Sequence, residues 1–373
     1  MPAGFDRRQI LGAAVAAPMV NKAEYQPVAT SGRRYARRVV DLVRENLVID
    51  MLGVLAIDYR PESFGARLSP AAAEFKASGI TVFHHSAGTS GPTAREDALQ
   101  WIAQAGVFVG RNDDRFLIVE KVSDFDRAKA AGKAAVILGL QNAEHFRGPD
   151  DVKLFYQLGQ RCSQLTYNAQ NLLGSGSTER VDGGVSDYGE AIIKAMNAVG
   201  MLVDVSHSGE RTTLDAASLS TKPIAITHSN CRALIDHPRC KSDAAIRAVA
   251  AKGGVMGVTG VRNFVRATEP TNVGHMVDHI DHIVRLVGIE HAGIGSDADL
   301  HGYDDLPADL YEQLKASYKT SYAFRGKIDT DGFDHPLKMF DLTEELVRRD
   351  YSNAAIAAIL GGNFRRLLGQ TWL

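Results

Sequence analysis

The chain has few cysteines, no long apolar run and almost no net charge, and each of these absences excludes a class of protein. Three cysteines in 373 residues, Cys162, Cys231 and Cys240, are too few and too scattered for a disulfide framework. No apolar stretch reaches the roughly 20 residues that a membrane-spanning helix needs. The formal net charge of −2 gives no reason to expect nucleic acid as a partner. What remains is an ordinary globular composition, 45% hydrophobic, with a small molecule as the expected partner.

The N-terminus is the exception to this ordinary composition. Arg7 and Arg8 precede a short run of small, mildly apolar residues, and Ala14-Val15-Ala16 offers an A-x-A cleavage site. This order resembles a twin-arginine export signal, which carries folded proteins across the bacterial inner membrane. We therefore expect residues 1–31 to be a signal and linker, and the mature protein to be periplasmic. The alternative is a frayed amphipathic helix on a cytoplasmic protein.

From residue 32 to the end, strand-like and helix-like segments alternate. Eight short runs rich in β-branched residues are separated by helical patterns, and this order predicts an α/β fold, a (β/α)8 TIM barrel, in one domain of residues 32–373. Two further helices are expected at 339–349 and 352–360, and residues 312–331 should pass over the barrel mouth. The expected strands are Leu47–Val54, Ile80–His85, Ala135–Leu140, Cys162–Tyr167, Met201–His207, Ile224–His228, Val255–Thr259 and Ala292–Asp297.

Two of these expected strands each run apolar residues into a terminal histidine, His207 and His228. The 21 positions that separate them (228 − 207) leave room for one helix at 210–219 and two short loops. The histidines should therefore lie side by side at the same end of adjacent parallel strands. Neutral imidazoles in that arrangement commonly bind Zn²⁺ or a similar cation. The alternative is a pair of strand-end histidines that only hydrogen-bond loop backbone.

Other expected strand ends are polar as well, and in such barrels the chemistry sits at the C-terminal strand ends. Each of these residues also has an ordinary interpretation as a packed or backbone-bonded side chain, but a full ring of them favours a site. Side chains alternate along a strand, so one residue of the His-His pair on the second strand should face the mouth and the other should face outward. The candidates are His84, His85, Gln141, Asn142, Tyr167 and Asp297, with Arg239 on the loop after the His228 strand.

From residue 138 onward, short segments of the chain resemble the renal (membrane) dipeptidase family, the M19 group of metal-dependent peptidases. The similarity covers more than half of the chain in the right order and implies the barrel fold. The resembling segments are 156–159 (YQLG), 164–167 (QLTY), 196–201 (MNAVGM), 205–207 (VSH), 227–229 (THS), 237–239 (HPR), 278–283 (DHIDHI), 293–297 (GIGSD) and 361–364 (GGNF).

The resemblance implies roles for four of the candidate residues. In that family two bridged zinc ions in the barrel mouth hydrolyse dipeptides. His207 and His228 match the two histidines of one metal position. Asp297 matches the aspartate that handles the proton of the metal-bound water, and could also ligate the metal. Arg239 matches the arginine that binds the substrate carboxylate, a task that suits a forked guanidinium.

The other half of the family site departs from the pattern. Leu52 and Val54 stand where the family's first strand has His-x-Asp, Gln141 stands for the bridging glutamate, and Tyr167 stands for a histidine that polarises the scissile carbonyl. Two zinc ions about 3.5–4 Å apart need anionic ligands to offset their repulsion. We therefore expect one divalent ion, most simply zinc. Gln141, with a weak carbonyl oxygen, is a candidate ligand. His84 or His85 is a possible replacement for the lost ligands.

Three functions remain open from the sequence. The first is a metal-dependent hydrolase of small peptide-like or amide substrates, in which Asp297 takes a proton, Tyr167 steadies the oxyanion, and Arg239 and Asn142 contact a carboxylate-bearing substrate. The second is a lyase, an isomerase or a metabolite-maturation enzyme on the same barrel, which the coordinated replacement of ligands favours. The third is a non-catalytic family member. A homodimer is possible in each case, and fold alone cannot choose between them.

Overall fold

The computed structural model describes residues 24–25, 33–53 and 74–372. The predicted twin-arginine motif and Val54 lie outside the described residues. Within them, no helix is both long enough and apolar enough to cross a membrane. Three cysteines, all in the described part, are buried as free thiols.

Eight strands in chain order form the parallel barrel that the sequence predicts. Each pairs with the next through parallel ladders. The first and last strands approach where Met51 N–H donates to the Ile294 carbonyl at 2.9 Å and Asp297 N–H donates to the Leu52 carbonyl at 2.8 Å. The strands are β3 (Ile49–Asp50), β4 (Val82–Ala87), β6 (Ala134–Leu140), β7 (Gln160–Gln164), β8 (Leu202–Asp204), β9 (Ala225–Ser229), β10 (Val255–Val258) and β11 (Ala292–Ile294). A short extra strand, β5 (Phe116–Ile118), which the sequence pattern does not predict, pairs with β6.

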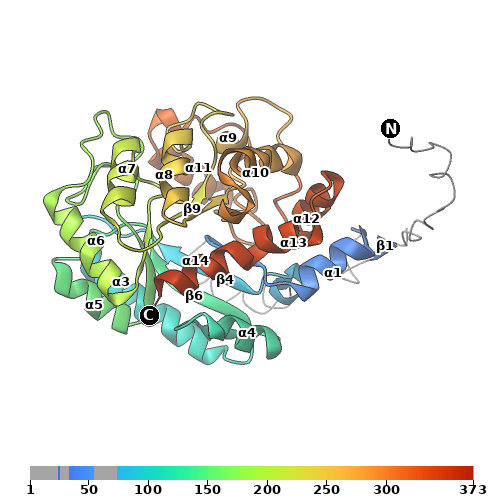
Figure 1. The fold of residues 1–373 in the computed structure, drawn as a ribbon, viewed down its shortest axis with the longest axis horizontal. Helices are drawn as coiled ribbons and strands as arrows, with labels where there is room; N and C mark the ends of the chain where they lie inside the picture. Colours follow the sequence, from blue (N-terminus) through green and yellow to red (C-terminus); the bar gives the residue numbers. More distant parts are fainter. Residues whose placement is uncertain (1–23, 26–32, 54–73, 373) are drawn as a thin grey trace, which may run out of the picture.

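Helices surround the strands (Figure 1), and some of them carry typical capping residues at their ends. At the N-terminus of α6 (Asp187–Val199), the Ser186 side chain accepts a hydrogen bond from Gly189 N–H. The same helix ends at Gly200, whose φ of 82° suits a residue without a Cβ. The helices between strands are α3 (Ala94–Arg111), α4 (Ser123–Ala130), α5 (Pro149–Gln157), α6 (Asp187–Val199), α7 (Glu210–Leu219), α8 (Asp243–Ala251), α9 (Arg262–Val265) and α10 (Val273–Val287).

The first described helix and two of the C-terminal helices pack together on one side of the barrel. Helix α1 (Arg37–Glu45) lies beside α12 (Lys338–Arg348), as Figure 1 shows in blue and red. The predicted C-terminal helical pair is present as α12 and α13 (Asn353–Ala357), followed by a short π-helical turn and α14 (Asn363–Thr371). One apolar cluster joins the first residues of the barrel strands, such as Leu202 and Val255, to Phe364 of α14. This end of the barrel is therefore a packed core, which leaves the opposite end for a site.

The predicted excursion over the barrel mouth is observed after β11. We call residues 299–335 the lid; it contains α11 (Ala308–Ser317) and a 3₁₀ turn at Thr320–Tyr322. Its aromatic residues form a separate apolar cluster with the loops after β9 and β10, which includes Phe264 and Tyr322. The lid therefore has its own small core, distinct from the cores of the barrel.

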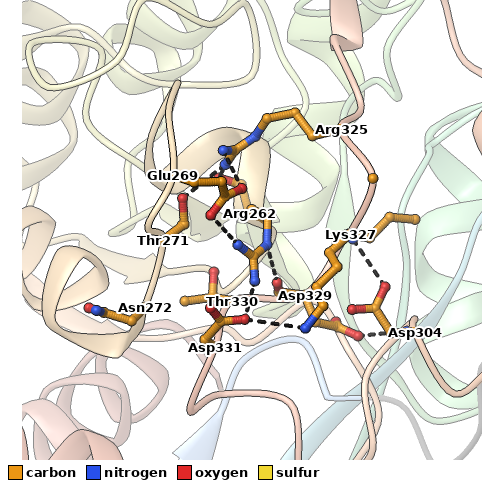
Figure 2. A network of polar contacts seen from close by, with 12 residues as sticks. Arg262, Glu269, Thr271, Asn272, Asp304, Arg325, Lys327, Asp329, Thr330 and Asp331 are labelled. Atoms are coloured by element: carbon orange, nitrogen blue, oxygen red, sulfur yellow. Dashed lines mark hydrogen bonds and ion pairs between the residues drawn. The ribbon is translucent and has the colours of Figure 1, made fainter.

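Arg262 anchors the returning limb of the lid to the loop after β10 (Figure 2). Its side chain is only 3% exposed and forms ion pairs with Glu269 at 2.6 Å and with Asp331. Its Nε donates to the Asp329 carbonyl at 2.6 Å. Arg325, on the lid, also pairs with Glu269 at 2.6 Å. Two arginines therefore share one carboxylate across the junction.

Candidate active site

A cavity of about 280 Å³ lies at the C-terminal ends of the barrel strands, under the lid. We call it the inner cavity. The barrel and its loops supply one wall and the lid supplies the other, with six of the 13 lining residues. The lining residues are Leu52, Gln141, Tyr167, His207, Val261, Phe264, Asp297, Tyr303, Leu314, Tyr318, Tyr322, Phe324 and Ile328.

His207 is held in the cavity wall by two neighbours. Its ring stacks on Tyr167, with 4.0 Å between centroids and 19° between planes. Its Nδ1 lies 2.8 Å from the Asn168 side-chain oxygen, which also accepts from the Tyr322 hydroxyl at 3.1 Å. Because an amide oxygen only accepts, Nδ1 must carry the imidazole proton. Nε2 of the neutral ring therefore keeps its lone pair.

His228 also carries its imidazole proton on Nδ1, because Thr227 and Asp204 form a hydrogen-bonded chain with it. The Thr227 hydroxyl donates to Asp204 at 2.5 Å, so it accepts from His228 Nδ1 at 2.8 Å. Nε2 of His228 is buried without a hydrogen-bond partner among the described residues. The centroids of the His207 and His228 rings lie 5.1 Å apart. Burial, and then the charge of Arg239, holds the pKa of both histidines well below the ordinary value, which keeps both rings neutral.

Asp297 stands on the same wall, at the end of β11. Its φ of 59° places it in the left-handed region, a strained position for a non-glycine residue and one common at functional sites. Burial raises its pKa from 3.8 to about 7, against the opposing charge of Arg239, and nearby Asp50 adds to the rise. A carboxyl group that titrates near neutrality suits general acid–base chemistry.

Arg239 lies behind the cavity wall rather than in it. The side chain is fully buried and is not among the residues that line the inner cavity. Its guanidinium donates to the carbonyls of Ser206 and, at 3.4 Å, of His228, and stands 5.4 Å from the Phe264 ring centroid. Its charge acts on the histidines and on Asp297 from this position. Direct contact with a substrate, as the resemblance implies, stays a prediction.

The remaining candidate residues divide between the inner cavity and other places. Gln141 lines the inner cavity, whereas Asn142 lines a second cavity of about 370 Å³ beside it, the outer cavity. His84 faces the barrel interior: its Nδ1 donates to the Met51 carbonyl at 2.8 Å, and its Nε2 is buried without a partner among the described residues. His85 faces outward and packs against Trp101 of α3, with ring centroids 5.4 Å apart. The alternation expected for the two neighbouring histidines is therefore observed.

Sequence reasoning missed three residues of the site. Asn168 orients His207, and Tyr318 and Tyr322 close the cavity from the lid. The richness of residues 312–331 in tyrosine was a usable signal for a mouth-covering segment, but no spacing rule says which tyrosine points inward.

A parallel barrel with an imidazole pair and a neutral-range carboxyl at its C-terminal end is the arrangement of a barrel hydrolase. A family model, membrane dipeptidase (peptidase family M19), matches residues 68–317, which is more than half of the chain. The chain therefore belongs to the membrane dipeptidase family, a family of metal-dependent hydrolases. The resemblance found in the sequence is confirmed.

Individual relatives agree with this assignment. Dipeptidase verJ of Clonostachys rogersoniana is 29% identical over 273 residues, which are 72% of this chain and 64% of that protein. A crystal structure of an amidohydrolase from Pseudomonas aeruginosa is 29% identical, with a TM-score of 0.78 over 90% of this chain and 99% of that one. The probable dipeptidase PvdM from the same organism is 20% identical, with a TM-score of 0.75 over 90% and 98% of the two chains.

The family implies a divalent metal, and the donor set decides what this chain can hold. The described residues contain no group of three or more His, Cys, Asp or Glu side chains placed to hold a metal. Leu52 and Gln141 both line the cavity, and neither is an anionic ligand. What the site does offer is two imidazoles, that of His207 in the cavity wall and that of His228 buried beside it. Their Nδ1 protons are engaged, as those of the ligating histidines of metal sites usually are. The described residues therefore offer two imidazole nitrogens to a cation.

Proposed function

We propose that this chain is a hydrolase of small, carboxylate-bearing amide or peptide-like substrates, with a site reduced to one divalent ion. One observation carries the proposal. His207 and His228 lie side by side with their Nδ1 protons bound to acceptors, so both Nε2 lone pairs are prepared for a cation. Packing alone does not require that both rings be fixed in this tautomer.

His207 and His228 would hold the ion, and zinc suits two neutral imidazoles best. When bound, the ion supplies a Lewis acid and an activated water. Asp297, with a pKa of about 7, accepts the proton that the attacking water loses and returns it to the leaving amine. Tyr167 donates its hydroxyl to the developing oxyanion. Arg239 favours a negatively charged substrate from behind the wall, and the aromatic lid excludes bulk water.

A second candidate function rests on the opposite wall of the cavity. Leu52 and Gln141 stand there in place of the expected ligands, yet both are in contact with the cavity. A lyase, an isomerase or a maturation enzyme would keep the barrel, the acid–base carboxyl and the lid while losing the second metal. This candidate predicts a metal-loaded protein that cleaves no dipeptide or N-acyl amino acid.

Metal content tests the proposal directly. We expect inductively coupled plasma mass spectrometry of the purified protein to find about one divalent ion per chain, and His207→Ala and His228→Ala each to lose it. His282→Ala is the matched control, because this histidine pairs with Asp243 at 2.7 Å on the helical layer. A metal-free native protein would reject the proposal. With metal present, a panel of dipeptides and N-acyl amino acids separates hydrolysis from the second candidate.

We also propose that the protein is exported to the periplasm by its N-terminal segment. The support is the twin-arginine order at Arg7 and Arg8 in the sequence. Fractionation of expressing cells, with Arg7→Lys/Arg8→Lys as the comparison, tests this. Retention of the native chain in the cytoplasm would contradict it.

A further inference from the structure

Two tyrosines meet at the inner cavity from different parts of the chain. Tyr167 follows β7 in the barrel, and Tyr318 follows α11 in the lid. Their hydroxyl oxygens lie 2.8 Å apart, and both residues line the cavity. The family match ends at residue 317, so Tyr318 lies just beyond it. The pair therefore joins a barrel residue inside the matched segment to a lid residue just outside it.

Counting protons shows what the pair offers. A tyrosine hydroxyl has one proton and an ordinary pKa near 10, so at neutral pH the two hydroxyls together carry two protons. Their mutual hydrogen bond uses one. The second proton has no acceptor among the hydrogen bonds that the described residues form. Whichever oxygen carries it, the pair presents one O–H donor where a ligand can reach it.

The surroundings define the ligand that would accept this proton. Phe264, Tyr322 and Phe324 make the rest of the nearby wall aromatic. The buried guanidinium of Arg239 lies behind this wall, and its charge acts on both Tyr167 and Asp297. A volume of about 280 Å³ limits the occupant to a small molecule. A planar or branched apolar body with one anionic oxygen satisfies all three conditions.

We propose that Tyr167 and Tyr318 form a hydrogen-bond donor site for an anionic oxygen of a small aromatic or branched apolar ligand in the inner cavity. The inference rests on the proposed function only in placing the ligand in that cavity, and it deepens that proposal by naming a recognition element. Two further contacts of the lid hold the pair in place. The Tyr322 hydroxyl donates a hydrogen bond to Asn168, and the Tyr318 ring packs on the Tyr322 ring with centroids 4.4 Å apart.

The alternative is that the hydroxyl pair only fastens the lid to the barrel. The two roles differ in their sensitivity to ligand charge. A donor site should discriminate between an anionic oxygen and a neutral one, because hydrogen bonds to charged groups are roughly twice as strong. A fastening should affect every occupant of the cavity equally.

Calorimetric titration with benzoate and with its neutral analogue benzamide separates the two roles. The proteins are the full chain, Tyr167→Phe, Tyr318→Phe, the double variant, and Tyr311→Phe as the matched control. The Tyr311 hydroxyl binds Asp304 and the Gly326 carbonyl, both at 2.9 Å, and the residue does not line the inner cavity. Metal content is measured for each protein, so that only samples with equal loading are compared.

We expect the double variant to bind benzoate at least about 10-fold more weakly, which is the value of one hydrogen bond to a charged group. Benzamide should lose about threefold or less. Each single variant should lose less than half of the double variant's free energy, because the remaining hydroxyl can turn its proton to the ligand. Tyr311→Phe should bind both compounds as the native chain does.

Three results would overturn the inference: native protein that does not bind benzoate, a double variant with unchanged benzoate affinity, or equal losses for benzoate and benzamide. None of these readouts requires turnover. A protein that hydrolyses no amide but loses benzoate selectively in the double variant would reject the proposed function and keep the tyrosine site. A protein that hydrolyses amides with an unaltered benzoate profile would do the reverse.

Discussion

The two sides of the inner cavity differ in what supports their side chains. On the β8–β9 side, His207 and His228 each have a dedicated acceptor for Nδ1, and behind His228 stands Asp204, which accepts from Ser206 and Thr227. On the β3–β6 side, Leu52 and Gln141 line the cavity. His84, in the barrel interior, donates its Nδ1 proton to the Met51 carbonyl, and its Nε2 has no partner among the described residues.

The difference lies in what each side presents to the cavity. On the β8–β9 side, hydrogen bonds to Nδ1 orient two neighbouring imidazoles and leave their Nε2 atoms unprotonated. On the β3–β6 side the cavity meets neutral groups, although His84 there has an engaged Nδ1 as well. Both sides stand on strands that are positioned by their ladders and by the core of the barrel.

Removing the Asp297 carboxyl, on the same wall as His207, should have the largest effect. We expect Asp297→Asn to lower kcat/KM by about 1,000-fold, because the general base is lost. Burial raises the Asp297 pKa from 3.8 to about 7, so the base is protonated below neutrality and ionised above it. The native rate should therefore rise with pH through about 7, as measured by initial rates between pH 5 and 9. A rate that is flat across this range would contradict the assignment.

A methyl group added at Gly139 tests whether the space around the His84 ring, on the β3–β6 side, is tightly packed. A Cβ on Gly139 would lie 1.9 Å from His84 Nε2, which ordinary contacts do not allow. We expect Gly139→Ala to lower the free energy of unfolding by about 1–3 kcal/mol, measured by urea denaturation. Gly106→Ala on α3 is the control, because its Cβ would meet nothing within 4 Å. Equal midpoints for Gly139→Ala and the native chain would show that His84 moves freely.

Cutting the support on the β8–β9 side should have the smallest effect of the three. Thr227→Val keeps the shape of the side chain but removes the acceptor for His228 Nδ1. Loss of such an outer hydrogen bond should weaken metal binding by about 10-fold, measured by competition with a chromophoric chelator. Thr166→Val is the control, since among the described residues its hydroxyl hydrogen-bonds to Ser208 alone, at 3.1 Å. Similar affinity in both variants would mean that the tautomer of His228 is set by other groups.

Much of this molecule follows from local sequence pattern. Short β-branched runs between helical periods give eight parallel strands, and a parallel barrel brings its strand ends together. That was enough to bring His207, Gln141, Tyr167 and Asp297 to one cavity, with His228 beside His207. The same alternation predicted that one of His84 and His85 faces inward, and the structure shows that it is His84. These are properties of neighbouring residues and a repeated topology.

The rest depends on contacts that sequence spacing does not encode. The tautomer of His207 is set by Asn168 and Tyr322, which come from a loop and from the lid. Arg239 lies behind the wall because backbone carbonyls accept its protons there. Tyr318 and Tyr311 belong to one tyrosine-rich segment, yet only Tyr318 reaches the inner cavity. Such choices are made by side-chain packing after the topology is set.

The anchoring of the lid by Arg262 determines how molecules can enter. Raising the returning limb would separate the nearly buried guanidinium of Arg262 from Asp331 and from the Asp329 carbonyl, and would separate Arg325 from Glu269. The outgoing limb carries α11, which has no buried residue. The lid is also tied to the barrel near α11, where the Tyr318 hydroxyl contacts Tyr167 and the Tyr322 hydroxyl donates to Asn168. We therefore expect a ligand to enter by opening these neutral hydrogen bonds, while the charged Arg262 junction stays closed.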